Sequence, residues 1–217
     1  FCTIEPNVGI VEVPDPRLQQ IAAIVRPQRI QPAIVEFVDI AGLVAGASKG
    51  EGLGNQFLAN IRETDAIVSV IRCFDDDNVV HVSGRVDPLS DIETILTELA
   101  LADLASVERT LNREIKKARA GDKEAQKLVG ILERLLPHLN DGKPARTLTL
   151  AADEKARLKP LCLLTIKPTM YVGNVLENGF LNNPHLDRLR THAAIEGAPV
   201  IALCAKIEAE LADLDDE

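Results

Sequence analysis

Short apolar runs alternate with amphipathic segments along most of this chain. Five runs rich in aliphatic and β-branched residues predict strands, at 8–13, 33–38, 66–71, 169–172 and 199–203. Asp15-Pro16 is typical of a helix cap followed by proline at the first helical position, so a short helix is expected over 16–25. A second helix is expected over 53–62, after a glycine-rich loop. Because strands and helices alternate, the pattern predicts an α/β domain with a mostly parallel sheet flanked by helices.

The apolar spacing changes between residues 71 and 169, where strand patterns are scarce. Apolar residues recur there every three to five positions, at Ile92, Ile95, Leu99, Leu104, Val107, Leu111 and Ile115. After a break at 120–122 the pattern resumes with Leu128, Ile131 or Leu132, Leu135 and Leu139. We therefore expect an antiparallel, coiled-coil-like helical arm at 89–145, inserted between two parts of the α/β domain at 1–88 and 146–217. The alternative is a pair of helices packed on the sheet.

Charge distinguishes the expected arm from the rest of the chain. The whole chain has a net charge of −9, which disfavours general polyanion binding. Residues 105–146, in contrast, hold ten basic and six acidic side chains, a net charge of +4. Five basic residues crowd the expected tip, Arg113, Lys116, Lys117, Arg119 and Lys123. Such a tip suits an RNA or ribosome contact, although charge runs are commonly only a solvated helix face. Glu93 and Glu98 are expected to be solvated.

Composition excludes several other classes. Aromatic residues are only 3% and Trp is absent, which argues against a base-stacking platform for single-stranded nucleic acid. The four cysteines are far apart in sequence, so they indicate neither a zinc site nor a disulfide framework, and they suit a reducing cytoplasm. No apolar run approaches the length of a membrane span, and no membrane partner is expected. The chain begins at Phe1 instead of Met, and we expect it to be an internal fragment.

The strand at 33–38, which we expect to be buried, leads into Asp39-Ile40-Ala41-Gly42. A carboxylate at the end of a strand can hold Mg²⁺ through water, and a glycine lets a backbone N–H approach a terminal phosphate. Thr3, in a loop before the first strand, could ligate the same ion with its hydroxyl. Asp-x-x-Gly after a strand is also a common turn, so this motif needs support from elsewhere in the chain.

Two further segments follow the last two strands. Asn174-Val175-Leu176-Glu177 offers an amide and a carboxylate that could read a nucleotide base; the alternative is an Asn-rich turn before Asn178-Gly179. In Cys204-Ala205-Lys206 a backbone N–H could meet the base edge while the lysine stem covers its face. We expect the nucleotide to contact Val175, Cys204, Ala205 and Lys206 together with Asn174 and Glu177.

Taken in this order, the segments resemble the GTPase-type domain of translation factors, and more closely the YchF subfamily of Obg-like ATPases. The resemblance covers essentially the whole chain. It is carried by Phe1–Asn7, by 36–72 with its Val38–Asn55 stretch, and by 84–103, 167–177 and 204–208. It implies a P-loop NTPase fold with a helical arm, and a cytoplasmic, ribosome-associated molecular switch that hydrolyses ATP.

The resemblance also implies roles for single residues. Asn174 and Glu177 match an Asn-x-x-Glu base reader that prefers ATP, with GTP weaker. Thr3 and Asp39 would serve Mg²⁺, and Gly42 would sense the γ-phosphate. Leu43 stands where many GTPases carry a catalytic glutamine, so water must be positioned by backbone, a K⁺ ion or a partner. Lys206 lies at a variable position of the family, which makes its role less secure.

One motif is missing from these 217 residues. They contain no G-x-x-x-x-G-K-[ST] loop to cradle phosphates, so we expect a P-loop upstream, a TGS domain downstream, and poor nucleotide binding by this piece alone. The rival hypothesis is a non-catalytic interaction module that works through the arm. A P-loop lysine in the parent protein would discriminate between them.

Overall fold

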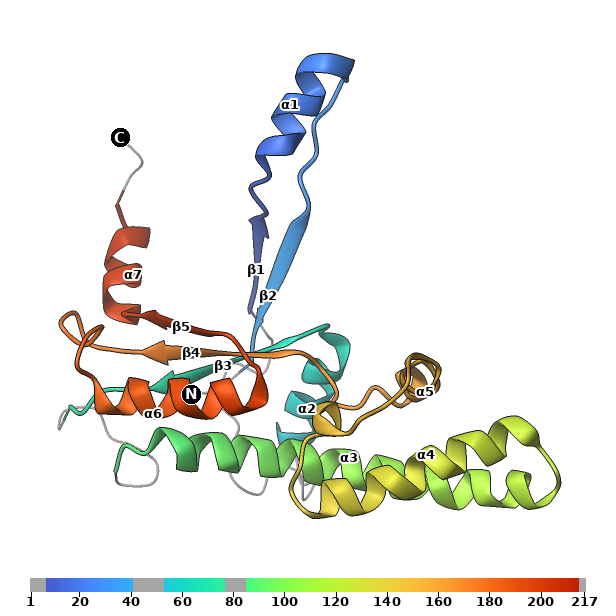
Figure 1. Ribbon diagram of the computed structural model, residues 1–217. Helices are drawn as coiled ribbons and strands as arrows, with labels where there is room; N and C mark the ends of the chain where they lie inside the picture. Colours follow the sequence, from blue (N-terminus) through green and yellow to red (C-terminus); the bar gives the residue numbers. More distant parts are fainter. Residues whose placement is uncertain (1–6, 41–52, 77–84, 215–217) are drawn as a thin grey trace. The chain divides into compact units, whose positions relative to one another are not determined.

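The structure, a computed structural model, describes residues 7–40, 53–76 and 85–214. The chain divides into two units, Phe1–Gly42 and Leu43–Glu217 (Figure 1). No helix of the described ranges is long and apolar enough to cross a membrane. Cys73, Cys162 and Cys204, three of the four cysteines, are free thiols.

The first unit is a β-ribbon closed by a helix. Strand β1 (Asn7–Glu12) pairs antiparallel with β2 (Ile34–Asp39), and α1 (Pro16–Val25) lies between them in sequence. Helix α1 has the bounds that the sequence predicts: the Asp15 side chain accepts a hydrogen bond from the Arg17 N–H at 3.0 Å and proline occupies the first turn. The expectation that the second strand is buried is wrong, because Phe37 is 52% exposed and Ile34 53%. Within its own unit a two-stranded ribbon has no second layer to cover it.

The second unit is built on a parallel sheet in the order β3-β4-β5, formed by Ile67–Arg72, Thr169–Asn174 and Val200–Leu203. One face of the sheet is covered by α3 (Pro88–Arg119) and by α6 (Pro184–Glu196), as Figure 1 shows. The core between them holds Ile71, Ile92, Tyr171, Val175, Leu186 and Leu189. The α/β architecture and these three strands therefore confirm the sequence prediction. Two further helices, α2 (Leu53–Glu63) and α7 (Ala205–Ala212), belong to the same unit.

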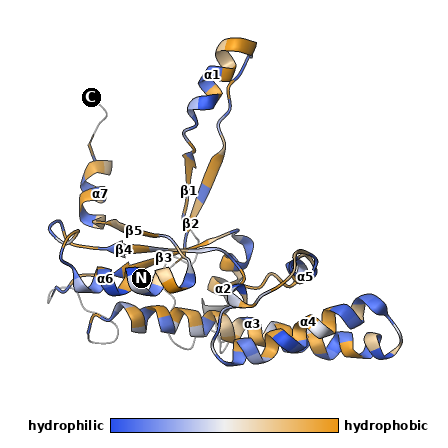
Figure 2. Cartoon of the chain, viewed as in Figure 1, coloured by the Kyte–Doolittle hydropathy of each residue, from blue (hydrophilic) through white to orange (hydrophobic). Residues whose placement is uncertain are grey.

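The arm is formed by α3 (Pro88–Arg119) and α4 (Lys123–Asn140). The first half of α3 packs against the sheet through Ile92, and only its second half pairs with α4, where Val107, Leu132 and Leu135 are buried. The arm interpretation therefore holds for α4 and the second half of α3, whereas the alternative, a pair of helices packed on the sheet, describes only the first half of α3. The hydrophilic colours of Figure 2 gather toward the tip of the hairpin.

The return from the arm runs through three short helices, η2 (Ala145–Thr147), α5 (Ala152–Leu158) and η3 (Lys159–Leu161). It is tied to α3 by Asp103, which is fully buried. The Asp103 carboxylate accepts hydrogen bonds from the N–H groups of Leu164 and Thr165, at 2.8 and 2.7 Å, and from the Thr165 hydroxyl at 2.7 Å. Glu98, on the same helix, is also buried, so the expectation that it is solvated is wrong: this part of α3 lies inside the α/β unit.

Candidate nucleotide-binding site

The carboxyl ends of β4 and β5 lie side by side and bring two sequence motifs together. Asn174 is the last residue of β4 and pairs in register with Leu203, the last residue of β5. Cys204 follows at once as the N-cap of α7. Because ligands of open parallel sheets bind outside the carboxyl ends of the strands, this edge is where a nucleotide base would be read.

The Asn174 side chain is fixed in one orientation. Its Oδ1 accepts a hydrogen bond from the Ala205 N–H at 3.0 Å, while the N–H of Val175 donates to the Leu203 carbonyl at 2.9 Å. The amide nitrogen of Asn174 consequently points elsewhere, and no acceptor within the described ranges takes its hydrogen bond. The sequence predicts that a backbone N–H of residues 204–206 meets a base edge, whereas the N–H of Ala205 is used to orient the Asn174 side chain.

Glu177 and Lys206 form the second contact between the two loops. The Lys206 Nζ donates to Glu177 Oε1 at 2.7 Å, and both side chains remain more than half exposed. This hydrogen bond lowers the pKa of the Glu177 carboxyl and raises the pKa of Lys206. The carboxylate is thus held ionised, as an acceptor for N–H groups, with a lysine stem beside it.

The remaining residues of the two motifs support the loops from below. Val175 is 1% exposed and Cys204 3%, so either can reach a ligand only through its backbone. Asn183, which sequence reasoning missed, donates from Nδ2 to the carbonyls of Cys73 at 2.8 Å and Gly179 at 2.9 Å. It thereby ties the loop after β4 to the end of β3. Its only sequence signal is the N-cap position before Pro184.

The phosphate side of the expected site lies mostly outside the described residues. Thr3, Gly42 and Leu43 are among those outside, whereas Asp39 is the last residue of β2 in the first unit. The described ranges contain no cluster of three or more metal-ligating side chains. Mg²⁺ at nucleotide sites commonly takes one or two protein oxygens and completes its shell with phosphates and water, so a single carboxylate such as Asp39 is a chemically suitable donor.

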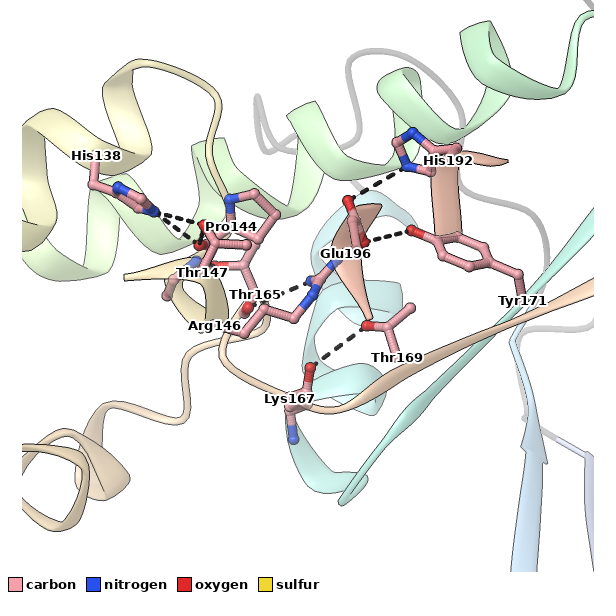
Figure 3. Close-up of polar contacts among 11 residues, drawn as sticks. His138, Pro144, Arg146, Thr147, Thr165, Lys167, Thr169, Tyr171, His192 and Glu196 are labelled. Atoms are coloured by element: carbon pink, nitrogen blue, oxygen red, sulfur yellow. Dashed lines mark hydrogen bonds and ion pairs between the residues drawn. The ribbon is translucent and has the colours of Figure 1, made fainter. Parts of the chain in front are cut away.

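A polar junction links the return from the arm to the sheet (Figure 3). Glu196 Oε2 accepts hydrogen bonds from Arg146 Nη2 at 2.7 Å and from the Tyr171 hydroxyl at 3.0 Å. The other carboxylate oxygen, Glu196 Oε1, lies 3.4 Å from His192 Nε2. The His192 ring meets the Tyr171 ring edge-on. Burial, followed by the negative charge of Glu196, raises the pKa of Tyr171. The junction places η2 of the arm return against β4, three residues before Asn174.

The fold defines a class: a domain of the P-loop GTPase fold with a long helical arm. A family model described as "50S ribosome-binding GTPase" matches residues 1–107. Two curated relatives, each named "Ribosome-binding ATPase YchF", are 60% identical in Escherichia coli O157:H7 and 50% in Bacillus subtilis (strain 168). The solved "Structure of the Schizosaccharomyces pombe YchF GTPase" superposes with a TM-score of 0.78 at 32% identity over 99% of this chain.

The chain belongs to the YchF family. Its full length aligns with the two bacterial relatives, and it spans 60% of the length of each and 59% of the solved yeast chain. The resemblance seen in the sequence is thereby confirmed, together with the fold class.

Proposed function

We propose that the protein containing this chain is a Mg²⁺-dependent ATPase, with ATP preferred over GTP, that acts as a molecular switch on the ribosome. One observation carries the proposal: the hydrogen bond between Ala205 and Asn174 and the ion pair between Lys206 and Glu177 join two loops into a preformed base reader. The names of the relatives, which describe ribosome-binding ATPases, support both halves of the proposal.

Purine reading follows from the orientation of Asn174. With Oδ1 held by Ala205, the amide presents Nδ2, a donor suited to the N7 acceptor of a purine. The ionised Glu177 accepts from N–H groups, and the 6-amino group of adenine is such a donor. Guanine carries a carbonyl oxygen at the same ring position, so an acceptor would face an acceptor. Lys206 covers the base with its methylene stem while it remains paired with Glu177.

The phosphate end of the nucleotide is assigned to the residues of the Thr3 and Asp39–Gly42 motifs. Thr3 and Asp39 would hold Mg²⁺, which would neutralise the charge of the β- and γ-phosphates, and the N–H of Gly42 would sense the γ-phosphate. Leu43 brings no hydrogen-bonding group to the attacking water. The water is therefore positioned by backbone groups, by a K⁺ ion or by a partner.

Ribosome association is assigned to the arm, with its basic tip formed by Arg113, Lys116, Lys117, Arg119 and Lys123. Ion pairs with an acidic residue reduce the positive charge that this tip can offer to a ligand. Glu114 is buried and pairs with Arg113 at 2.8 Å and with Lys117 at 3.0 Å. Within the described part of the chain Lys116, Arg119 and Lys123 make no ion pair, and they are the tip residues best placed to meet phosphates.

Replacement of Asn174 by alanine tests the base reader. In the whole protein that contains this chain, Asn174→Ala is expected to weaken ATP binding about tenfold, because one base hydrogen bond contributes about 1–1.5 kcal/mol. The measurement is the Kd for ATP by isothermal titration with Mg²⁺ present, next to the Kd for GTP of the unsubstituted protein.

Asn112→Ala is the matched control, since Asn112 is exposed on α3, away from both loops. An unsubstituted protein that binds ATP and GTP equally contradicts the proposed preference. An Asn174→Ala protein with unchanged ATP affinity contradicts the base reader itself. A protein that binds ribosomes but no nucleotide supports the rival hypothesis, an interaction module working through the arm.

A further inference from the structure

The base-reading loop closes in a tight turn shortly before α6. The Gly179 N–H donates to the Leu176 carbonyl at 2.8 Å, so Glu177 lies at the second position of a four-residue turn. A Cβ added at Gly179 would lie 3.1 Å from the backbone nitrogen and oxygen of Leu176. The turn is therefore closely packed on itself, and the exposed Glu177 side chain takes its position from the place of this turn.

Asn183 holds the turn from outside. Its Nδ2 donates to the Gly179 carbonyl at 2.9 Å and to the Cys73 carbonyl at 2.8 Å. Cys73 is fully buried, and its own N–H donates to the Asn174 carbonyl at 2.8 Å. One amide nitrogen thus connects the turn that carries Glu177 with the backbone beside Asn174, and these are the two side chains that would read the base.

The start of α6 gives Asn183 a fixed position. Asn183 Oδ1 accepts a hydrogen bond from the Leu186 N–H at 3.1 Å and so caps the helix. Leu186 and Leu189 have no exposed surface and belong to the core beneath the sheet. A Cβ added at Gly173, in β4, would lie 2.7 Å from Leu186 Cδ1, so the helix packs as closely on the strand as a glycine permits. An amide anchored in this way is a rigid support for the loop that it contacts.

We infer that Asn183 is a positioning residue of the base reader: through its Nδ2 it fixes the place of Glu177 and thereby sets the affinity of the site for adenine. The inference rests on the proposed function and adds to it a residue that acts through Glu177. The two polar atoms of Asn183 have separate tasks, because Oδ1 caps α6 and Nδ2 holds the loop. Loss of the amide nitrogen alone should therefore loosen the loop and leave the helix cap in place.

Asn183→Asp makes this separation, because it keeps the capping oxygen and loses the donor. In the whole protein that contains this chain, the variant is expected to raise both the KM and the Kd for ATP with Mg²⁺ about tenfold at unchanged kcat, the effect of one lost base hydrogen bond. Inorganic tripolyphosphate has no base, so its Kd is expected to stay the same. Asn183→Ser, which also caps helices but is too short to reach both carbonyls, should change the constants in the same direction.

Asn182→Asp is the matched control, since Asn182 is exposed and gains the same negative charge one residue earlier. It is expected to change none of these constants. Glu177→Ala completes a double-mutant cycle. Because Asn183 acts through Glu177, Asn183→Asp added to Glu177→Ala should raise the Kd for ATP by less than about twofold more.

An unchanged Kd for ATP in Asn183→Asp overturns the inference, and so does an equal loss of affinity for ATP and tripolyphosphate. Effects of Asn183→Asp and Glu177→Ala that simply add would show that Asn183 does not act through Glu177. A kcat that falls with the midpoint of thermal unfolding, at constant KM, would give Asn183 a structural role alone. Failure of the unsubstituted protein to bind ATP would contradict the proposed function as well, which distinguishes that outcome from the others.

Discussion

Asp103 is the residue on which the path back from the arm depends. Its carboxylate has no exposed surface and satisfies two backbone N–H groups and one hydroxyl of residues 164 and 165. Burial raises the pKa of Asp103, and its hydrogen bonds oppose that shift only in part. A buried group with several donors around it costs much free energy when it is removed, because the donors are left without partners.

We expect Asp103→Ala to lower the free energy of unfolding by about 2–4 kcal/mol, since it strands two buried N–H groups. The contribution of Asp103 to the free energy of unfolding should also depend on pH. Because the pKa of Asp103 is raised by folding, its contribution to stability is greatest below the ordinary carboxyl pKa and falls as pH rises through the raised value.

Urea unfolding between pH 4 and pH 8 measures both effects. Asp103→Asn removes the titrating group, so the difference in free energy of unfolding between the unsubstituted protein and this variant should change across that interval and level off above it. A difference that stays constant over the whole range would show that Asp103 does not titrate with folding.

Some site residues could be predicted because local sequence signals them, and others could not. Asn174 and Glu177 directly follow a recognisable strand, and parallel pairing brings Ala205 and Lys206 to them. The Arg146–Glu196 pair joins residues 50 positions apart, which no periodicity encodes. Asp103 likewise contacts residues about 60 positions away, and before the fold is known it is one acidic residue among many on a long helix.

At the level of helices and strands, period and turn chemistry located the five strands, α1, α2 and the two helices of the arm, but they did not predict α5, α6 or α7. They could not divide α3 between two environments, because the same three- and four-residue apolar spacing serves packing on a sheet and packing on α4. They also could not give the burial of β2, which depends on the layers around a strand and not on its own residues.

The turn between α3 and α4 offers a matched pair of glycines. Gly121 has φ +95° and Gly130 lies inside α4, and an added Cβ would meet nothing within 4 Å at either position. Gly121→Ala is expected to lower the free energy of unfolding by about 1–2 kcal/mol, because L residues disfavour positive φ. Gly130→Ala is expected to raise it by about 0.5–1 kcal/mol through helix propensity. Urea unfolding, followed by circular dichroism, measures the free energy of unfolding of both variants. Equal changes in the two variants would contradict the positive φ of Gly121 in this turn.

At the level of the whole molecule, the sheet of the second unit has two unlike faces. Val70 and Ile201 are 63% and 51% exposed, whereas Ile71, on the opposite face, is 2% exposed. The exposed residues carry no packing energy of their own, yet an apolar surface of this kind favours association in solution.

Val70→Thr is therefore expected to change the free energy of unfolding by less than about 0.5 kcal/mol, while it reduces self-association measured by light scattering. Its neighbour supplies the control: Ile71→Thr buries a hydroxyl and removes core volume, which should cost about 2–4 kcal/mol. Similar losses for the two variants would mean that both faces of β3 are packed.

Helix α3 runs without interruption from Pro88 beneath the sheet to Arg119 at the arm tip. At 1.5 Å per residue the half that extends beyond the sheet is about 24 Å long. A tilt of about 10° where the helix meets the sheet would swing its far end by about 4 Å, with no flexible joint to absorb the motion. The helix is in this sense a lever, and small rearrangements in the α/β unit would reach the far end of the arm magnified.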